Sequence, residues 1–235
     1  MNPKYMFDSY LKEFDTMIKS VKDDKFIVLN DTIFYPNGGG QPNDTGLLRI
    51  ENGEEYKVIF VGKFSGEISH EVEKPGLKVG DKVKCIIDWD RRYAHMRYHT
   101  ASHVLSAILH EKAGAQITGN QITEEKLRID FNMDNFDREL LQEYVDEANL
   151  ELKKNHEVTI TFMEREEALK LPGMVKLAGA LPPNVKELRI VTIGTVDRQA
   201  DGGTHVKNTS ECGSLEIIKA ENKGKNNRRL YVKMV

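Results

Sequence analysis

The chain has 235 residues, of which 39% are hydrophobic and 30% are charged, and its formal net charge is −3. This composition is typical of a soluble globular protein, and no apolar run approaches the roughly 20 residues that cross a bilayer, so we expect no membrane partner. The two cysteines, Cys85 and Cys212, are too few for a disulfide framework. The N-terminus also lacks the apolar stretch of a secretory signal peptide, and we therefore expect a cytoplasmic protein.

The first part of the chain, from about residue 10 to residue 88, has the pattern of a β protein. Short apolar runs are separated by Gly, Asn, Asp and Pro, with room for one short helix near the start. The clearest runs are FIVLND at 26–31, YKVIFVG at 56–62 and KVKCIIDW at 82–89. Residues 1–90 are therefore predicted to form a small N-terminal β-barrel domain.

The second part, residues 91–235, contains long helical patterns. A first helix is predicted over DRRYAHMRYHTASHVLSAILHEKA, with Gly114 as its C-terminal cap. A second helix, capped by Asp134 or Asn135, is predicted to run to about His156 because apolar residues recur at helical spacing. A short third helix is predicted over REEALKL.

Strand patterns alternate with these helices. The segment KLRIDFNM at 126–133 alternates apolar and polar residues with period two, and VTITF and ELRIVTIG have the same character. At the end of the chain, LEIIKAEN and RRLYVKM are predicted to form a hairpin through KGKNN. Long helices laid against an antiparallel sheet predict an α+β fold, a two-layer α/β domain that follows the barrel.

Two segments far apart in the sequence each carry a pair of side chains that can bind metals. His99 and His103 are spaced i, i+4, which places their imidazoles on one face of the first helix. Asp201 and His205 have the same spacing, but the glycines between them disfavour a helix, so we expect this pair on a loop or strand end. Together the four residues predict a zinc site, with one Zn²⁺ per chain.

Simpler interpretations compete with this zinc site. Two histidines four residues apart also occur on exposed helix faces, and only the second pair favours a metal. A structural zinc site would use cysteines, and a zinc peptidase would have glutamate where Thr100 stands. Asp201 is either the fourth ligand or an acceptor that orients His205, and the sequence does not decide between these two roles.

Three longer motifs carry a resemblance to a known family. FYPNGGGQPNDTG at 34–46, RYHTASHVLSAIL at 97–109 and DRQADGGTHVKNTSECG at 197–213 occur in the order typical of the free-standing AlaX proteins. The chain resembles this alanyl-tRNA editing family, which is homologous to the editing domain of alanyl-tRNA synthetase, over essentially its whole length. The resemblance implies an N-terminal barrel and the editing domain shared with threonyl-tRNA synthetase. It also implies zinc ligation, although this chain has Asp201 where the family has a cysteine.

The activity that this resemblance implies is hydrolysis of the ester bond in mischarged tRNA(Ala). Ser-tRNA(Ala) is the main expected substrate and Gly-tRNA(Ala) is a second candidate. No synthetase core fits beside these motifs, so the chain is expected to edit in trans. A pocket that hydrogen-bonds the serine hydroxyl leaves polar groups unpaired when alanine enters, which makes rejection of alanine feasible. The zinc either activates a water or holds the amino group of the substrate, and both mechanisms stay open.

Two segments supply candidates for the substrate pocket. Thr118 and Gln121, in ITGNQ between the first helix and the RIDF strand, are predicted to contact the substrate, although ordinary loop polarity explains them equally well. The glycine-rich segment is the second candidate. Gly39, Gly40 and Gln41 lie in a turn bracketed by prolines, which we expect to pack near the editing pocket.

A tRNA ligand requires a positively charged surface on a chain that is acidic overall. We expect RNA rather than DNA as the partner. Two basic groups are candidates for phosphate contacts, although a solvated charged face explains any single member equally well. They lie at the start of the first helix and around the last hairpin, and they are Arg91, Arg92, Arg97, Lys223, Lys225, Arg228 and Arg229.

Two other functions are retained as alternatives. The replacement of a ligand cysteine by Asp201 is compatible with a tRNA-binding module that has lost catalysis. The GGQ tripeptide that ends at Gln41 also occurs in peptide release factors, so a peptidyl-tRNA ester hydrolase is the second alternative. Three residues are weak support for it, and the AlaX pattern extends beyond them on both sides.

Overall fold

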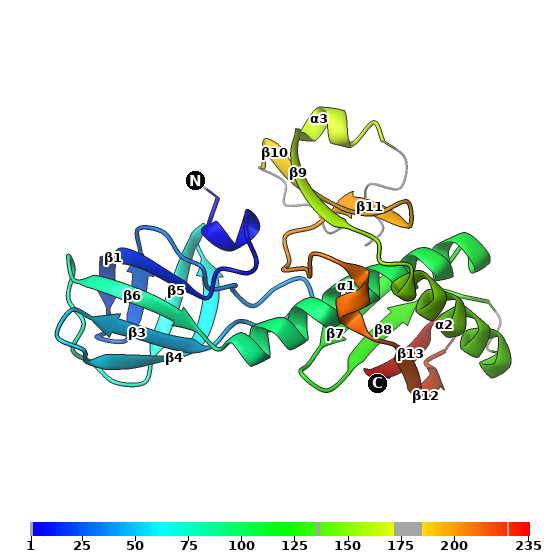
Figure 1. Ribbon diagram of the computed structural model, residues 1–235, viewed down its shortest axis with the longest axis horizontal. Helices are drawn as coiled ribbons and strands as arrows, with labels where there is room; N and C mark the ends of the chain where they lie inside the picture. The colour runs from blue at the N-terminus through cyan, green and yellow to red at the C-terminus, as the bar shows by residue number, and fades with distance from the viewer. Residues whose placement is uncertain (1, 135–136, 172–184, 225) are drawn as a thin grey trace. The chain divides into compact units, whose positions relative to one another are not determined.

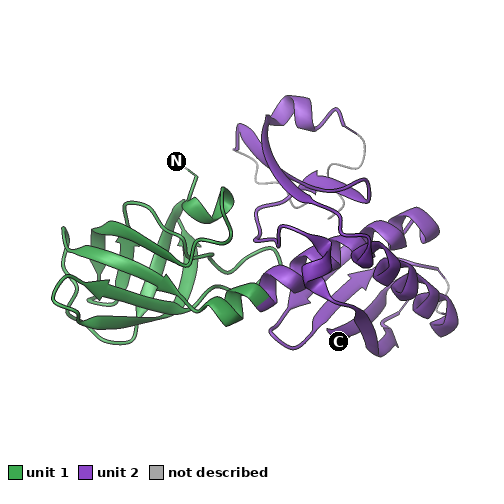
Figure 2. Ribbon diagram, viewed as in Figure 1, with its two compact units in different colours: residues 1–93 green, residues 94–235 purple. Residues whose placement is uncertain are grey.

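The structure is a computed structural model that describes residues 2–134, 137–171, 185–224 and 226–235. The chain forms two compact units, residues 1–93 and residues 94–235 (Figure 2). Buried apolar clusters are found in both units, so each has a core of its own. Among the described residues, no helix combines the length and the apolar character needed to cross a membrane.

The first unit contains a closed antiparallel barrel with the strand order β1-β2-β5-β4-β3-β6 (Figure 1). Its strands are β1 (Glu13–Lys22), β2 (Phe26–Leu29), β3 (Gly46–Ile50), β4 (Glu55–Phe64), β5 (Glu67–Val72) and β6 (Lys82–Ile87). Every second side chain of a strand points into the barrel and fills its interior. In β6 the side chains of Val83, Cys85 and Ile87 are buried, while those between them are more exposed. The predicted N-terminal β-barrel is confirmed.

The start of the barrel differs from the prediction. The short helix is only a 3₁₀ turn at Lys4–Met6, and strand β1 follows it. This strand is largely polar and Ile18 is its one fully buried residue, so its period-two pattern is weak. Strand β5 is also absent from the prediction because it places a polar residue, His70, in the interior.

The described residues from Trp89 onward form three α-helices, a 3₁₀ helix and two antiparallel sheets, and the first of these helices begins at the end of the first unit. The helices are α1 (Trp89–Ala113), α2 (Arg138–Lys153), α3 (Arg165–Ala168) and η2 (Thr209–Cys212). One sheet has the order β12-β13-β8-β7 and the other has the order β11-β10-β9, and Figure 1 draws α1 between them, while α2 contacts β12. The strands are β7 (Ile117–Ile122), β8 (Leu127–Phe131), β9 (Val158–Glu164), β10 (Glu187–Ile193), β11 (Asp197–Ala200), β12 (Leu215–Asn222) and β13 (Arg228–Met234). The α+β architecture is confirmed, with the antiparallel sheet in two parts.

Helix α2 begins later than predicted. Its N-cap is Asp137, whose carboxylate accepts hydrogen bonds from the backbone N–H groups of Glu139 and Leu140. Asp134 is therefore not the cap, and Asn135 lies outside the described residues. The ITGNQ segment, expected to be a loop, is strand β7, because β8 supplies its hydrogen-bond partners. The predicted hairpin of β12 and β13 is confirmed.

Candidate metal centre

Helix α1 carries two of the predicted ligands on one face. The helix ends before Gly114, whose φ of +61° is the left-handed conformation that a C-terminal glycine provides. His99 and His103 lie one turn apart, with 5.1 Å between their ring centroids. Both are buried, with exposed fractions of 2% and 6%. The helix therefore presents two imidazoles to the same region of the interior.

The loop after β11 carries the other two predicted ligands, Asp201 and His205. It is not helical, as the two glycines in it predict. The backbone of Gly203 approaches the ring of His99 so closely that a Cβ atom there would lie 2.0 Å from Cε1. The N–H of Gly203 also donates a hydrogen bond of 2.6 Å to Oδ2 of Asp201. Glycine at this position thus lets the loop bring its carboxylate next to the helix.

The four side chains converge on one point. One ligand atom from each of His99, His103, Asp201 and His205 lies within 4.8 Å of all the others. His205 Nε2 is 3.0 Å from Asp201 Oδ2, and His99 Nε2 is 3.6 Å from Asp201 Oδ1. The ring centroid of His205 is 4.4 Å from that of His99 and 4.8 Å from that of His103. Residues about a hundred positions apart in the sequence therefore form a single cluster.

Burial and mutual contact set the charge states in this cluster. Removal from water lowers the pKa of His205 to about 4, although the hydrogen bond to Asp201 opposes this shift. Burial also lowers the pKa of His99 well below its usual value. Burial raises the pKa of Asp201, but contact with His99 and His205 outweighs it and leaves that pKa well below its usual range. At neutral pH His99 and His205 are therefore neutral imidazoles and Asp201 is a carboxylate, which are the forms that bind metals.

Two side chains that orient the histidines are absent from the predicted site. Asp197 Oδ2 lies 2.9 Å from Nδ1 of His103, and Thr100 Oγ1 lies 3.1 Å from Nδ1 of His205. In both cases the contact is made by Nδ1, so Nε2 is the ring nitrogen that would bind a metal. The sequence contained a signal for the first of them, because Asp197 and Gln199 alternate before Asp201 and so share one face of a strand.

A buried arginine supports the loop from β10. The side chain of Arg189 is 1% exposed, and its Nη1 donates a hydrogen bond of 2.9 Å to the backbone oxygen of Asp201. The same nitrogen is 3.8 Å from Oδ2 of that residue. Its positive charge also disfavours protonation of His99 and His205. Arg189 therefore holds the loop and helps to keep the imidazoles neutral.

The predicted pocket residues Thr118 and Gln121 are exposed positions of β7. Gln121 lies opposite Arg128 of β8, whose neighbours Leu127 and Ile129 are buried. Neither residue is part of the metal cluster. Their contact with the substrate stays a prediction.

The glycine-rich segment forms a tight turn in the first unit. Gly39 and Gly40, with φ of +58° and +82°, occupy its two central positions, and Gly38 and Gln41 exchange backbone hydrogen bonds of 3.1 and 2.9 Å. Positive φ at both positions suits a two-residue hairpin turn, and glycine adopts it without strain. Gln41 is only 1% exposed, which disfavours its reaching a peptidyl-tRNA ester. The role of this turn at a substrate pocket stays a prediction.

The arginines at the start of α1 mainly form hydrogen bonds with other groups of the protein. Arg92 is fully buried and its Nε donates a hydrogen bond of 2.9 Å to the carboxylate of Asp44. Arg91 and Arg97 are partly exposed, and the Nε of each donates to a main-chain carbonyl oxygen, at 3.1 and 2.8 Å. The burial of Arg92 disfavours contact with a phosphate. For Arg91 and Arg97, tRNA binding stays a prediction.

The basic residues of the last hairpin have similarly different surroundings. Arg228 is 4% exposed and donates hydrogen bonds to carbonyl oxygens of its own hairpin, which disfavours a phosphate contact. Arg229 is bonded to Asp130 through Nε and Nη2, at 2.6 and 2.9 Å. Lys223 is exposed, and Lys225 lies outside the described residues. A role in tRNA binding for the exposed members of this group stays a prediction.

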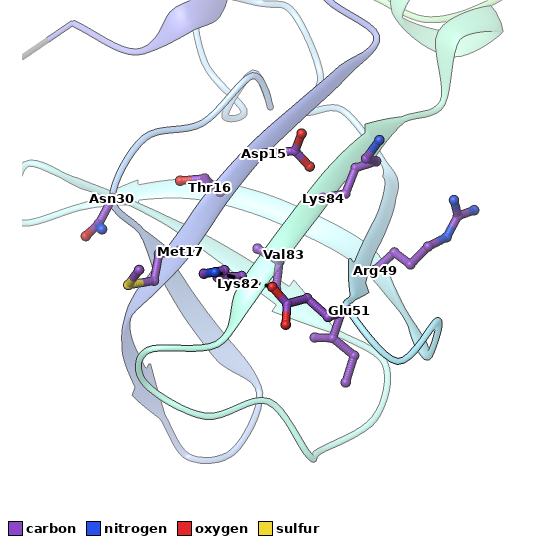
Figure 3. Close-up of a pocket in the computed structure, with 10 residues that line it drawn as sticks. Asp15, Thr16, Met17, Asn30, Arg49, Glu51, Lys82, Val83 and Lys84 are labelled. Atoms are coloured by element: carbon purple, nitrogen blue, oxygen red, sulfur yellow. Dashed lines mark ion pairs between the residues drawn. The ribbon is translucent and has the colours of Figure 1, made fainter.

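A separate open hollow of about 620 Å³ lies on the barrel (Figure 3). Residues of β1, β3 and β6 line it, and its basic side chains are paired with acidic ones: Lys82 with Glu51 at 3.4 Å and Arg49 with Glu55 at 2.6 Å. No residue of the metal cluster contributes to it. It is therefore not the candidate catalytic site.

Comparison with known proteins finds relatives over the whole chain. The alanyl-tRNA editing protein AlaX-M of Methanosarcina acetivorans is 48% identical over 97% of this chain and 96% of its own length. The protein of the same name from Methanosarcina barkeri is 49% identical over 98% of both chains. The one from Saccharolobus solfataricus is 48% identical over 97% of this chain and 96% of its own length.

Longer synthetases and two family models also match. The alanine–tRNA ligase of Pyrococcus abyssi is 40% identical over 92% of this chain, but only 24% of that ligase is covered. Residues 188–231 match the threonyl and alanyl tRNA synthetase second additional domain, and residues 6–91 match the class II (A) tRNA synthetases. The first of these matches includes the loop that carries Asp201 and His205.

Proposed function

Because this chain belongs to the family of alanyl-tRNA editing proteins and is an aminoacyl-tRNA deacylase, we propose that it removes serine from mischarged Ser-tRNA(Ala) in trans by zinc-dependent ester hydrolysis. Gly-tRNA(Ala) is the second proposed substrate. The observation that carries the proposal is the buried convergence of three histidines and Asp201 within 4.8 Å. We place the reaction in the cytoplasm, as a step that protects protein biosynthesis from error.

The donor set of the cluster fits zinc. Imidazole nitrogens and a carboxylate oxygen are both zinc ligands, and catalytic zinc sites commonly combine three protein ligands with one open position. We assign His99, His103 and His205 as the three ligands and Asp201 as the fourth. The side chain of Asp201 is 20% exposed, against 3%, 7% and 1% for the histidines, so it is the ligand most accessible to an incoming substrate.

The protein supplies preorganised ligands and selectivity. A bound zinc would supply a Lewis acid, which polarises the ester or lowers the pKa of a water. Burial keeps His99 and His205 neutral, so their lone pairs are available at neutral pH. Asp197 holds the ring of His103 in place, and Thr100 holds the ring of His205, each through a contact with the Nδ1 atom of the ring. A pocket that hydrogen-bonds the serine hydroxyl rejects alanine, because alanine leaves that pocket's polar groups unpaired.

The deciding experiment measures deacylation of Ser-tRNA(Ala) beside Ala-tRNA(Ala) by zinc-loaded protein. We expect loss of serine, retention of alanine and no activity in His103→Ala. A matched control is His110→Ala, which removes an exposed histidine from the same helix and should leave the rate unchanged. If serine is released only at the rate seen in buffer, the proposed serine-editing function is wrong.

Metal analysis separates the enzyme from a tRNA-binding module that has lost catalysis. One zinc per chain, lost in His99→Ala, supports the enzyme. Binding of tRNA without any zinc, in protein purified without chelators, supports the module. Asp201→Cys tests the fourth ligand separately. If residue 201 contacts the metal, the thiolate should increase zinc affinity, because soft ligands suit zinc.

A further inference from the structure

We infer that Asp197 is a positioning residue that holds His103 with its Nε2 lone pair toward the metal position. This inference rests on the proposed zinc-dependent function. Asp197 begins strand β11, four residues before Asp201, and its side chain is 0% exposed. Burial of a carboxylate is unfavourable unless it is paired and hydrogen-bonded. The hydrogen bonds of Asp197 therefore explain how this position accommodates a buried carboxyl group.

The hydrogen bonds of Asp197 determine which nitrogen of His103 carries the proton. Its Oδ2 lies 2.9 Å from Nδ1 of His103, and Nε2 of Gln199 donates to the same oxygen at 2.8 Å. A carboxylate oxygen accepts hydrogen bonds, so with Asp197 as the acceptor the Nδ1 of His103 is the donor and carries the proton. The amide nitrogen of Gln199 is also 2.9 Å from Nδ1, a contact in which the ring nitrogen would accept, but the carboxylate oxygen of Asp197 is the stronger partner for this nitrogen. The lone pair that His103 would give to a metal is therefore on Nε2.

The partner of His205 is chemically different. Its Nδ1 lies 3.1 Å from the hydroxyl of Thr100, which also accepts a hydrogen bond from the N–H of Val206 at 3.3 Å. A neutral hydroxyl both donates and accepts, so it does not determine the tautomer by itself. A carboxylate does determine it, and it also raises the basicity of the ligand nitrogen. Asp197 thus makes His103 a stronger and better oriented ligand than geometry on helix α1 alone would provide.

The first test compares zinc affinity in Asp197→Asn with that of the wild type, by competition with a chromophoric chelator. The substitution keeps the shape of the side chain, but it removes the negative charge and replaces one hydrogen-bond-accepting oxygen by a donating NH₂ group. We expect the dissociation constant for zinc to rise about 10- to 100-fold. A matched control is Asp130→Asn, which neutralises another buried carboxylate, bonded to Arg229 and outside the cluster. This control should leave zinc affinity unchanged.

The second test uses the wild-type protein and does not depend on the folding of a variant. Long-range ¹H–¹⁵N spectra of the metal-free protein, with His103 assigned through His103→Ala, should show the Nδ1–H tautomer. The Nε2–H tautomer would overturn the inference, as would an Asp197→Asn variant with wild-type zinc affinity. A wild-type protein that binds no zinc would overturn both the proposed function and this inference. Normal zinc binding with an unaffected variant would overturn the inference alone.

Discussion

The two units of this protein each bury histidines, and the comparison shows what distinguishes a structural histidine from a ligand. His70 in the barrel and His205 in the metal centre both have a pKa lowered to about 4, chiefly by burial. The two ring nitrogens of His70 lie 2.9 Å from the backbone oxygen of Ile27 and 2.9 Å from the hydroxyl of Thr32. His205 also has a partner at each ring nitrogen, the hydroxyl of Thr100 at 3.1 Å from Nδ1 and the carboxylate of Asp201 at 3.0 Å from Nε2, but its Nε2 partner belongs to a cluster that includes two further imidazoles. Converging lone pairs, rather than burial, therefore identify the site.

The largest expected effect concerns the barrel. Arg92→Ala removes the partner of the buried Asp44 carboxylate, and both side chains are 0% exposed. Breaking a buried ion pair from one side leaves an uncompensated charge, so we expect the free energy of unfolding to fall by about 3–5 kcal/mol in chemical denaturation. The control is Arg49→Ala, in an exposed pair with Glu55, where a loss of about 0–1 kcal/mol is expected. Equal losses in both variants would contradict the structural role of Arg92.

The next effect is the pH dependence that His70 confers. Its folded-state pKa of about 4 lies below the ordinary value of 6.5, so between these values the unfolded chain binds more protons. The free energy of unfolding should therefore fall as the pH decreases through this window, by about 1.4 kcal/mol per pH unit from this residue. Chemical denaturation of the metal-free protein at pH values between about 4.5 and 7 measures how the free energy of unfolding changes with pH. In His70→Gln the slope should become shallower, and an unchanged slope would show that His70 is not the cause.

A smaller effect is expected where the loop approaches the metal helix. Gly203→Ala places a methyl group 2.0 Å from His99 Cε1, so the ring or the loop must move. A displacement of about 1 Å at a reacting site can lower activity about 100-fold, and we expect a loss of this order in the deacylation rate. Gly202→Ala is the matched control, because a Cβ atom there meets nothing within 4 Å. Equal rates in the two variants would show that the close approach to His99 is not required.

The smallest effect tests the neutral partner of His205. Thr100→Val removes the hydroxyl that contacts Nδ1 and the N–H of Val206, with little change in volume. The loss of one neutral hydrogen bond is worth about 1 kcal/mol, so zinc affinity should fall about fivefold. Thr118→Val is the control for zinc affinity, and a lower deacylation rate in that variant alone would support its predicted place in the pocket. A Thr100→Val protein with unchanged affinity would mean that His205 needs no such partner.

Local patterns in the sequence predicted part of the fold. Strand β8 alternates apolar and polar residues, and helix α1 has apolar residues at helical spacing with Gly114 at its end, so both were predictable. Strands β1, β7 and β11 are mostly polar, and they are strands because neighbouring strands complete their hydrogen bonds. No pattern within a segment reports a partner that lies far along the chain.

By itself the sequence determined the identities of the four candidate ligands. Each pair of candidate ligands spans only five residues: His99 and His103 have i, i+4 spacing, and two glycines lie between Asp201 and His205. Local geometry is therefore enough to recognise each pair. Only the tertiary structure decided how these ligands are held. Asp197 meets His103 across 94 positions of sequence and Thr100 meets His205 across 105, through the packing of β11 and its loop against α1. These contacts depend on three-dimensional packing, which the order of residues in one segment does not encode.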